Sequence, residues 1–361
     1  MEQNLNAYQG CLLGLAVGDA MGFAIDDKTW AEIQENYGPN GLLGYDLQQE
    51  EYAQISSHTQ LTAYLCNGLL LGVTRGKNDW MRFCKLALQE WSRSQMFHRD
   101  PEKSWCWVAK LPYFRRRRCR DARMADVMRL ENFGTVESPK NRYTAPGAIT
   151  AAVAVGMFYN PKRMEPMQVG TLTTDLIALS HGDPTAFLSG AVVAYALVGI
   201  LHDPKLPLAQ QFRQAISLMQ TQFGRRFYQA EDLAEQFQEA IELAQSETVT
   251  PQEGMEKIGC LDAASCVAGA MFACLCAQDD FDKAIVTAVN HSGMSCAVGS
   301  VTGAIMGAKL GEEALPEFYW ESLECSRELG VLAEDILCGT PTLGVFDDEW
   351  DHKYVQCLPP E

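Results

Sequence analysis

GCLLGLAVGDAMG, residues 10–22, carries a glycine at every fourth position. Residues spaced by four lie on one face of an α-helix, and a face without side chains lets a second helix approach closely. The segment lacks the strand and turn that frame a phosphate-binding loop. We therefore expect a close crossing of two helices here.

Helical periodicity dominates the rest of the chain, and few stretches alternate as strands do. Helices that are apolar on all sides, as in 188–200 and 264–276, have to be surrounded by other helices. This pattern predicts a multi-layer all-α fold, with helices over 147–158, 185–202, 206–220, 230–246, 262–278 and 296–309.

One domain is expected over residues 1–345, because no linker, low-complexity tract or internal repeat divides the chain. The segment 96–143 is the least regular part and is interpreted as an excursion from the helical body; whether it covers a cleft stays open. The acidic C-terminal tail, 346–361, is expected to be peripheral.

The composition indicates a globular protein with an acidic surface. Against 46 Asp and Glu stand 29 Lys and Arg, which gives a net charge of -17. This charge repels nucleic acid and anionic membranes, and we expect neither a signal peptide nor a membrane span. Many of the 13 cysteines lie in apolar segments, which indicates free thiols in a reducing cytoplasm. The oligomeric state stays open.

Two polar segments are candidates for function. In Ser180-His181-Gly182-Asp183-Pro184, Asp183 is predicted to cap a helix, and His181 serves either a bound anion or packing. The run Arg115–Arg118 suits nucleotide phosphates or an acidic partner; alternatively it is a solvated loop that pairs with this protein's own acidic surface.

Six segments, taken together and in this order, carry a resemblance to the ADP-ribosylglycohydrolase superfamily, which includes the glycohydrolase that activates dinitrogenase reductase and a lens crystallin. The match runs from about residue 8 to about residue 311. The segments are GCLLGLAVGDAMG (10–22), YGPNGLLGY (37–45), SSHTQLT (56–62), 147–156, SHGDPTA (180–186) and AVNHSGMSCAVGSVTGAIMGA (288–308).

The resemblance implies an orthogonal bundle of many helices that uses two Mg²⁺ ions to hydrolyse the bond between ADP-ribose and an arginine or serine side chain. Two motifs supply most metal ligands, one similar to Thr-Asp-Asp-Thr-Gln and the other to Gly-Asp-x-Asp-Thr. Two neighbouring Mg²⁺ ions need several carboxylates, because these ions prefer hard oxygen ligands and repel each other.

In this chain, all four motif aspartates are replaced. The first motif falls on 56–60, where Ser56 takes the threonine position and Ser57 and His58 take those of the aspartates. The second falls on 293–297, where the replacements are Met294, Cys296 and Ala297. Imidazole, thioether and thiol groups are poor Mg²⁺ ligands. No cofactor is therefore expected.

Other residues are assigned roles through the resemblance alone. It places an acidic residue near the scissile bond at Asp26 or Asp27, which are the candidate catalytic residues. An arginine and an asparagine expected to contact ADP-ribose are replaced by Ala151 and Pro146. The candidate ligand-binding residues are Asp19, Gly147, His181 and Asp183.

The favoured interpretation is a degenerate member that binds an ADP-ribose-like small molecule or a partner protein, or that is purely structural. The alternatives are enzymatic. One is a Zn²⁺ site at His58 and Cys296, with His291 or Cys66 nearby. Another is metal-free catalysis with Cys296 activated by His58. A third is a diverged hydrolase that uses acids such as Asp19, Asp26, Asp27 or Asp183.

Overall fold

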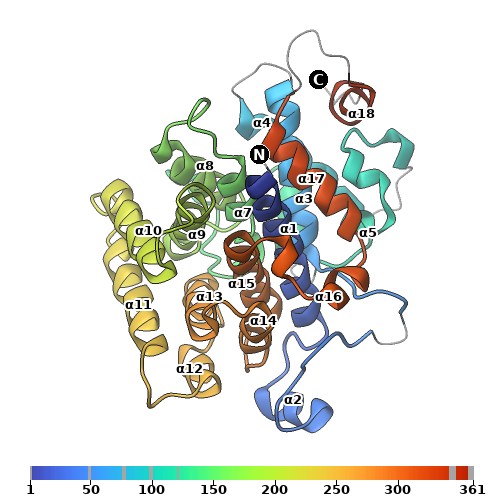
Figure 1. Ribbon diagram of the computed structural model, residues 1–361. Helices are drawn as coiled ribbons and strands as arrows, with labels where there is room; N and C mark the ends of the chain where they lie inside the picture. Colours follow the sequence, from blue (N-terminus) through green and yellow to red (C-terminus); the bar gives the residue numbers. More distant parts are fainter. Residues whose placement is uncertain are drawn as a thin grey trace.

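Helices build the fold wherever the computed structural model describes the chain, which is over residues 2–47, 50–74, 79–96, 101–119, 122–340 and 347–356. Across these ranges the only β pairing is an isolated parallel bridge between Ala53 and Leu323. The all-α prediction is confirmed (Figure 1).

The six predicted helices are present with ends shifted by a few residues. In the first of them Pro146 starts a 3₁₀ turn, and the α-helix begins only at Ala151. The elements are α1 (Glu2–Phe23), α2 (Trp30–Tyr37), α3 (Ser57–Thr74), α4 (Trp80–Met96), η1 (Pro101–Lys103), η2 (Trp107–Lys110), α5 (Pro112–Arg115), α6 (Ala122–Arg129), η3 (Pro146–Ala148), α7 (Ala151–Phe158), α8 (Pro166–Ala178), α9 (Pro184–His202), α10 (Leu208–Phe223), α11 (Gln229–Ala244), α12 (Pro251–Ile258), α13 (Ala263–Ala277), α14 (Phe281–Val289), α15 (Ser295–Leu310), η4 (Glu312–Ala314), α16 (Glu317–Glu321), α17 (Ser326–Cys338), α18 (Asp348–Trp350) and η5 (Asp351–Val355).

The glycine series of residues 10–22 packs α1 against α15 at the centre of the bundle (Figure 1). Gly10, Gly14 and Gly18 face the backbone of three glycines on α15, in antiparallel order: Gly307, Gly303 and Gly299. A Cβ atom at Gly14 would lie 2.9 Å from the carbonyl carbon of Gly303. The predicted close crossing is therefore confirmed.

The helices that are apolar on all sides lie inside the bundle. Nearly all of α9 and α13 is buried, as their sequences require. Among the described residues, α9 alone has the length and hydropathy of a membrane span, and 78% of that window is buried inside the protein. We interpret α9 as a core helix.

The irregular segment after α4 consists of short helices joined by turns, and its apolar side chains hold it to the body. Trp105, Val108 and Phe114 are all buried. Arg118, near the end of the described stretch 101–119, is also buried, with only 7% of its surface exposed. Residues 101–119 therefore lie against α3 and α4 as a packed layer.

The acidic tail packs more closely than we expected of a peripheral segment. Trp350, Lys353 and Tyr354 are buried, and Lys353 Nζ lies 2.6 Å from Asp335 Oδ2 of α17. The hydroxyl of Tyr354 donates to the same carboxylate oxygen and accepts a hydrogen bond from Trp107 Nε1. Residues 347–356 are thus part of the packed body, because their aromatic side chains outweigh their acidic composition; residues 346 and 357–361 lie outside the described residues.

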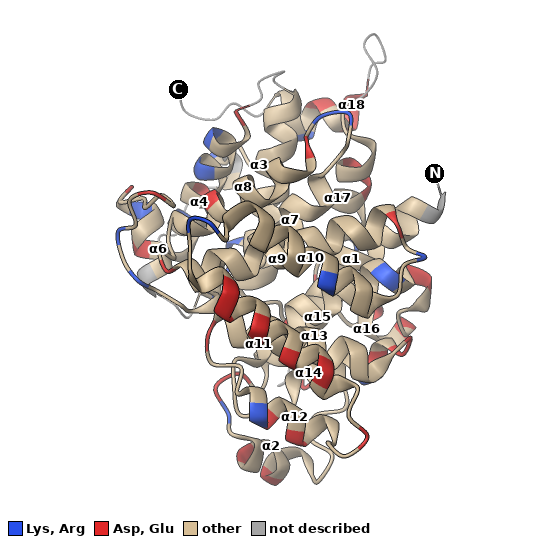
Figure 2. Ribbon diagram, turned by 90° about the vertical axis from the view of Figure 1, so that its left-hand side faces the viewer, with Lys and Arg blue, Asp and Glu red and all other residues tan. Residues whose placement is uncertain are grey.

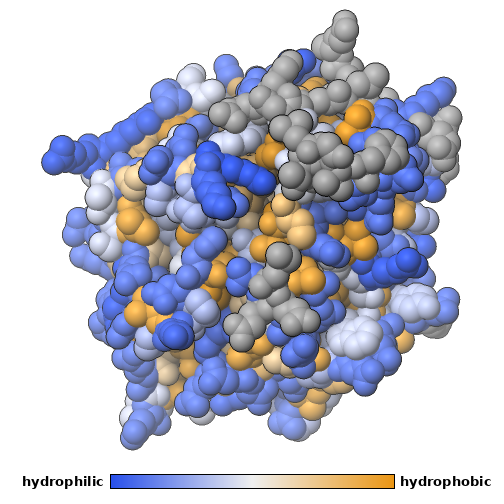
Figure 3. All heavy atoms as spheres, turned by 45° about the horizontal axis from the view of Figure 1, so that its top comes forward, coloured by the Kyte–Doolittle hydropathy of each residue, from blue (hydrophilic) through white to orange (hydrophobic). Residues whose placement is uncertain are grey.

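The surface carries the negative charge of the sequence. Figure 2 shows acidic residues spaced along α11, where Glu231, Glu235, Glu239 and Glu242 are exposed. On the face drawn in Figure 3, the visible apolar residues form small areas separated by polar ones. The repulsion of polyanions stays a prediction from this charge.

Candidate functional site

A cavity of about 440 Å³ opens where the C-terminal end of α1 meets the N-terminal ends of α3 and α15. It brings together most of the site residues that the sequence predicted, although they are spread over 270 positions. Gly22 packs against the backbone of Ser295 and Cys296, so the glycine contact of α1 with α15 also fixes this corner. The cavity is lined by Phe23, Asp26, Asp27, Ser56, Ser57, His58, Arg118, Ala145, Pro146, Gly147, Met294, Cys296 and Ala297.

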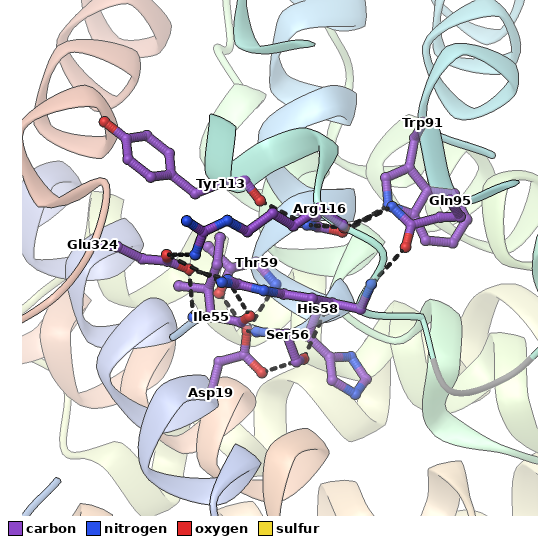
Figure 4. Close-up of polar contacts among 12 residues, drawn as sticks. Asp19, Ile55, Ser56, His58, Thr59, Trp91, Gln95, Tyr113, Arg116 and Glu324 are labelled. Carbon is purple, nitrogen blue, oxygen red and sulfur yellow. Dashed lines mark hydrogen bonds and ion pairs between the residues drawn. The ribbon is translucent and has the colours of Figure 1, made fainter. Parts of the chain in front are cut away.

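The first motif is fixed by Asp19, which lies beneath the cavity rather than in its wall. Its buried carboxylate accepts hydrogen bonds from the backbone N–H groups of Ser56 and Thr59, at 2.8 and 3.1 Å, and from both of their hydroxyls. Four donors satisfy this carboxylate and hold the first turn of α3 (Figure 4). The contacts of Asp19, a candidate ligand-binding residue, are those of a structural anchor.

The second motif begins α15, and Asp26 is bound to it. Asp26 Oδ1 accepts a hydrogen bond from Cys296 N at 3.0 Å, which caps the helix and places a carboxylate at its positive end. Asp27 is exposed and has a positive φ of 67°. Both candidate catalytic acids therefore reach the cavity, with Asp26 held in the wall and Asp27 at its solvent side.

His58 is the buried titratable residue of the first motif. The residue is 8% exposed, and its Nδ1 has no hydrogen-bond partner among the described residues. Figure 4 shows the ring pointing away from the Asp19 network. A buried polar atom without a partner costs free energy, and this nitrogen is a hydrogen-bonding group that the described part of the protein leaves unsatisfied.

The positions at which the resemblance expects metal ligands do not fit two Mg²⁺ ions. They offer neutral hydroxyls at Ser56 and Ser57, an imidazole, a thioether, a thiol and a methyl group, and the Ser56 hydroxyl is already bound to Asp19. Soft and neutral donors do not compensate the charge of two hard dications.

The zinc alternative lacks ligands in the part of the chain that the structure describes. There, no three side chains of His, Cys, Asp and Glu lie close enough together to hold a metal ion. His58 and Cys296 line the cavity, but His291 and Cys66 do not. Burial lowers the pKa of His291 to about 4 and raises that of the Cys66 thiol, so both are held neutral in the core at pH 7.

Arg118 lines the cavity, although its run was weighed as a solvated loop. Its guanidinium makes a bidentate ion pair with Glu324 and donates from Nη1 to the carbonyl oxygen of Ile55 at 2.7 Å. Burial, and secondarily the charge of Arg116, lowers its pKa to about 10, which leaves it charged at pH 7. Arg118 thus pairs with an acidic residue of this protein, as that alternative supposed, but the pair is buried and not solvated.

Two glutamines hold the backbone on which Arg118 lies. Gln60 Nε2 donates to the carbonyl oxygens of Tyr113 and Arg116, at 2.8 and 3.0 Å. Gln95 Oε1 accepts from the N–H groups of Arg118 and Cys119, at 2.9 and 3.0 Å. The segment 113–119 is thus bound to α3 and α4 through its main chain, which places Arg118 in the wall of the cavity.

Of the remaining predicted residues, one lies in the wall of the cavity and two lie outside its lining. Gly147 lines the cavity, and a Cβ atom there would lie 3.3 Å from Nε2 of His181. His181 is buried behind this wall, with its Nδ1 2.8 Å from Ser180 Oγ. Asp183 accepts from Thr185 N and caps α9, as predicted. Neither His181 nor Asp183 is among the lining residues.

Comparison with known proteins supports the assignment that these positions suggest. The sequence model of the ADP-ribosylglycohydrolase family matches residues 1–343. A solved structure described as an ADP-ribosylglycohydrolase-related protein complex is similar over 94% of this chain and 100% of its own, with a TM-score of 0.58 and 17% identity, a level that shows a common fold. A search of curated proteins gave no match. Because the family match spans nearly the whole chain, this protein belongs to the ADP-ribosylglycohydrolase family.

Proposed function

We propose that this protein binds a nucleotide-like ligand such as ADP-ribose in the cavity and does not carry out the Mg²⁺-dependent hydrolysis of its family. The observation that carries the proposal is the lining: both replaced motifs face the same cavity, with no carboxylate at Ser57, His58, Met294 or Cys296. A space of about 440 Å³ is within the range of small-molecule sites. The imidazole of His58 lies in the same wall and offers a ligand a polar ring.

A cytoplasmic location is part of the proposal. Every cysteine that the structure describes has a free thiol, and most are buried. Free thiols are typical of proteins in a reducing compartment.

Two measurements test the proposal. ADP-ribosylated arginine and serine peptides are incubated with the protein in Mg²⁺ or in EDTA, and we expect no Mg²⁺-dependent turnover. Calorimetric titration with ADP-ribose should show binding, which His58→Ala weakens about tenfold through a lost buried hydrogen bond. The matched control is Glu239→Gln on the exposed face of α11, which should bind like the wild type.

The outcomes separate the alternatives. Mg²⁺-dependent release of ADP-ribose would show that the ligand chemistry was misjudged. Turnover in EDTA that Asp26→Asn abolishes would favour the diverged hydrolase, which the two carboxylates in the cavity support. An absence of binding by wild type and both variants would leave a partner protein or a purely structural role, like that of a lens crystallin.

A further inference from the structure

Arg118 is a buried cation in a cavity whose other charged lining residues are acidic. It is the only Lys or Arg among the described lining residues, beside Asp26 and Asp27. Its side chain is 5% exposed, and that of its partner Glu324 is 6% exposed. A charge pair buried this deeply is costly to separate, because the remaining charge would be left without water or a counter-ion.

Other hydrogen bonds hold both Glu324 and Arg118 in place. Glu324 N donates to Ala53 O at 3.2 Å, and Glu324 Oε1 also accepts from Ile55 N at 2.9 Å. Arg118 is held from the other side, because Gln95 binds its backbone N–H. The guanidinium is therefore fixed beside the first motif before any ligand arrives, which reduces the entropy lost on binding.

Part of the guanidinium remains available. Of its five N–H groups, two on Nη1 and one on Nη2 account for the contacts with Ile55 and Glu324. The Nε–H and the second N–H of Nη2 have no partner among the described residues. Charged donors of this kind form strong hydrogen bonds with phosphate, carboxylate or carbonyl oxygens.

We propose that Arg118 is the resident cation of this cavity: it neutralises Glu324, donates its remaining N–H groups to an oxygen of the ligand, and makes binding independent of divalent cations. The ligand part of this inference rests on the proposed function. The disagreement between the lining and a pair of Mg²⁺ ions supports it, because the hydroxyl, imidazole, thioether and thiol groups of the replaced motifs are poor ligands for this ion.

Chemical rescue tests the charge. Arg118→Ala leaves Glu324 buried without its partner, and the cavity is open to a small cation. We expect a lower thermal midpoint for this variant, which methylguanidinium raises more than tetramethylammonium does at equal ionic strength. The matched control is Arg116→Ala: this arginine is half-exposed, lies 3.6 Å from the same Glu324, and should behave like the wild type. Equal effects of methylguanidinium on all three proteins would overturn the proposal.

A second variant keeps the test valid if Arg118→Ala does not fold. Arg118→Ala combined with Glu324→Gln removes the stranded charge as well as the guanidinium. We expect the double variant to be more stable than Arg118→Ala alone. If it is equally unstable, Arg118 acts through packing and the proposal is wrong.

Titration with ADP-ribose tests the ligand contact. Wild type should bind equally well in EDTA and in Mg²⁺, and Arg118→Lys, which keeps the charge but not the planar fork, should bind at least about tenfold more weakly. Binding that requires Mg²⁺ would overturn the inference. If wild type binds no ADP-ribose at all, the proposed function fails, whereas the methylguanidinium experiment still decides whether Arg118 is the resident cation.

Discussion

Replacing Gly14 with alanine should force α1 away from α15. The new Cβ atom would lie 2.9 Å from the carbonyl carbon of Gly303 and 3.3 Å from the Cα of Gly307. Ordinary contacts between carbon atoms are about 3.5–4.0 Å long, so the helices have to separate by roughly half an ångström or more. The opposing atoms are backbone atoms, which cannot rotate away.

The magnitude follows from two opposing terms. Overpacking costs about 1–3 kcal/mol. We expect the upper end of this range, because the added Cβ atom meets backbone atoms of Gly303 and Gly307, which cannot move without moving the helix. Alanine recovers up to about 1 kcal/mol through its better helix propensity. The net loss in the free energy of unfolding should therefore be about 2 kcal/mol.

Urea denaturation followed by circular dichroism measures this loss. Gly44→Ala is the matched control, because no atom lies within 4 Å of the position its Cβ would take. We expect the control to unfold at the midpoint of the wild type. If Gly14→Ala is as stable as the control, the glycine spacing does not fix the helix crossing and our reading of the fold is wrong.

Three further predictions concern the cavity wall and the core. Gln60→Leu removes the donor to the carbonyl oxygens of Tyr113 and Arg116, so it should lower the free energy of unfolding by about 2–4 kcal/mol. Amide hydrogen exchange in 113–119, measured by mass spectrometry, should become faster. Unchanged exchange would show that Gln60 does not hold this segment. Asp26→Ala removes the cap on Cys296 N and should cost about 1 kcal/mol in urea denaturation, whereas Asp26→Asn should cost less. The lowered pKa of His291, about 4, means that the unfolded chain binds a proton as the pH falls from 6.5 towards 4 while the folded chain does not. Wild type should lose about 3 kcal/mol over this window through His291, and a His291→Gln variant with the same pH dependence would refute this.

The helices were predictable because their signals are local. The spacing of Gly10, Gly14 and Gly18 predicts a packing face, and the uniform apolarity of α9 predicts burial, since each follows from helix geometry within one segment. The cap at Asp183 is local in the same way. The shared position of His58 and Cys296 is not local, and only the family resemblance predicted it.

The burial of Arg118 and its pairing with Glu324 could not be predicted from residue spacing. Its partner Glu324 lies 206 positions away, and no periodicity connects the two. The run of arginines gave a signal, but it did not distinguish Arg118, which is buried, from Arg116, which is half-exposed. Likewise, the burial of Tyr354 in an acidic tail depends on Asp335 and Trp107, which the tail's composition does not reveal.

The way α1 meets α15 explains how the cavity can keep its shape whichever side chains lie at the motif positions. The two helices meet through glycine backbone, so their crossing does not depend on which side chains lie at positions 294, 296 and 297. Asp19 anchors the start of α3 through four hydrogen bonds, so the first motif is also held from beneath the cavity rather than by a metal within it. Replacing acidic ligands in such a scaffold removes repulsion between like charges without removing a packing contact. The cavity can therefore change its chemistry while its shape is set elsewhere, and Arg118 together with His58 is where that chemistry should now be sought.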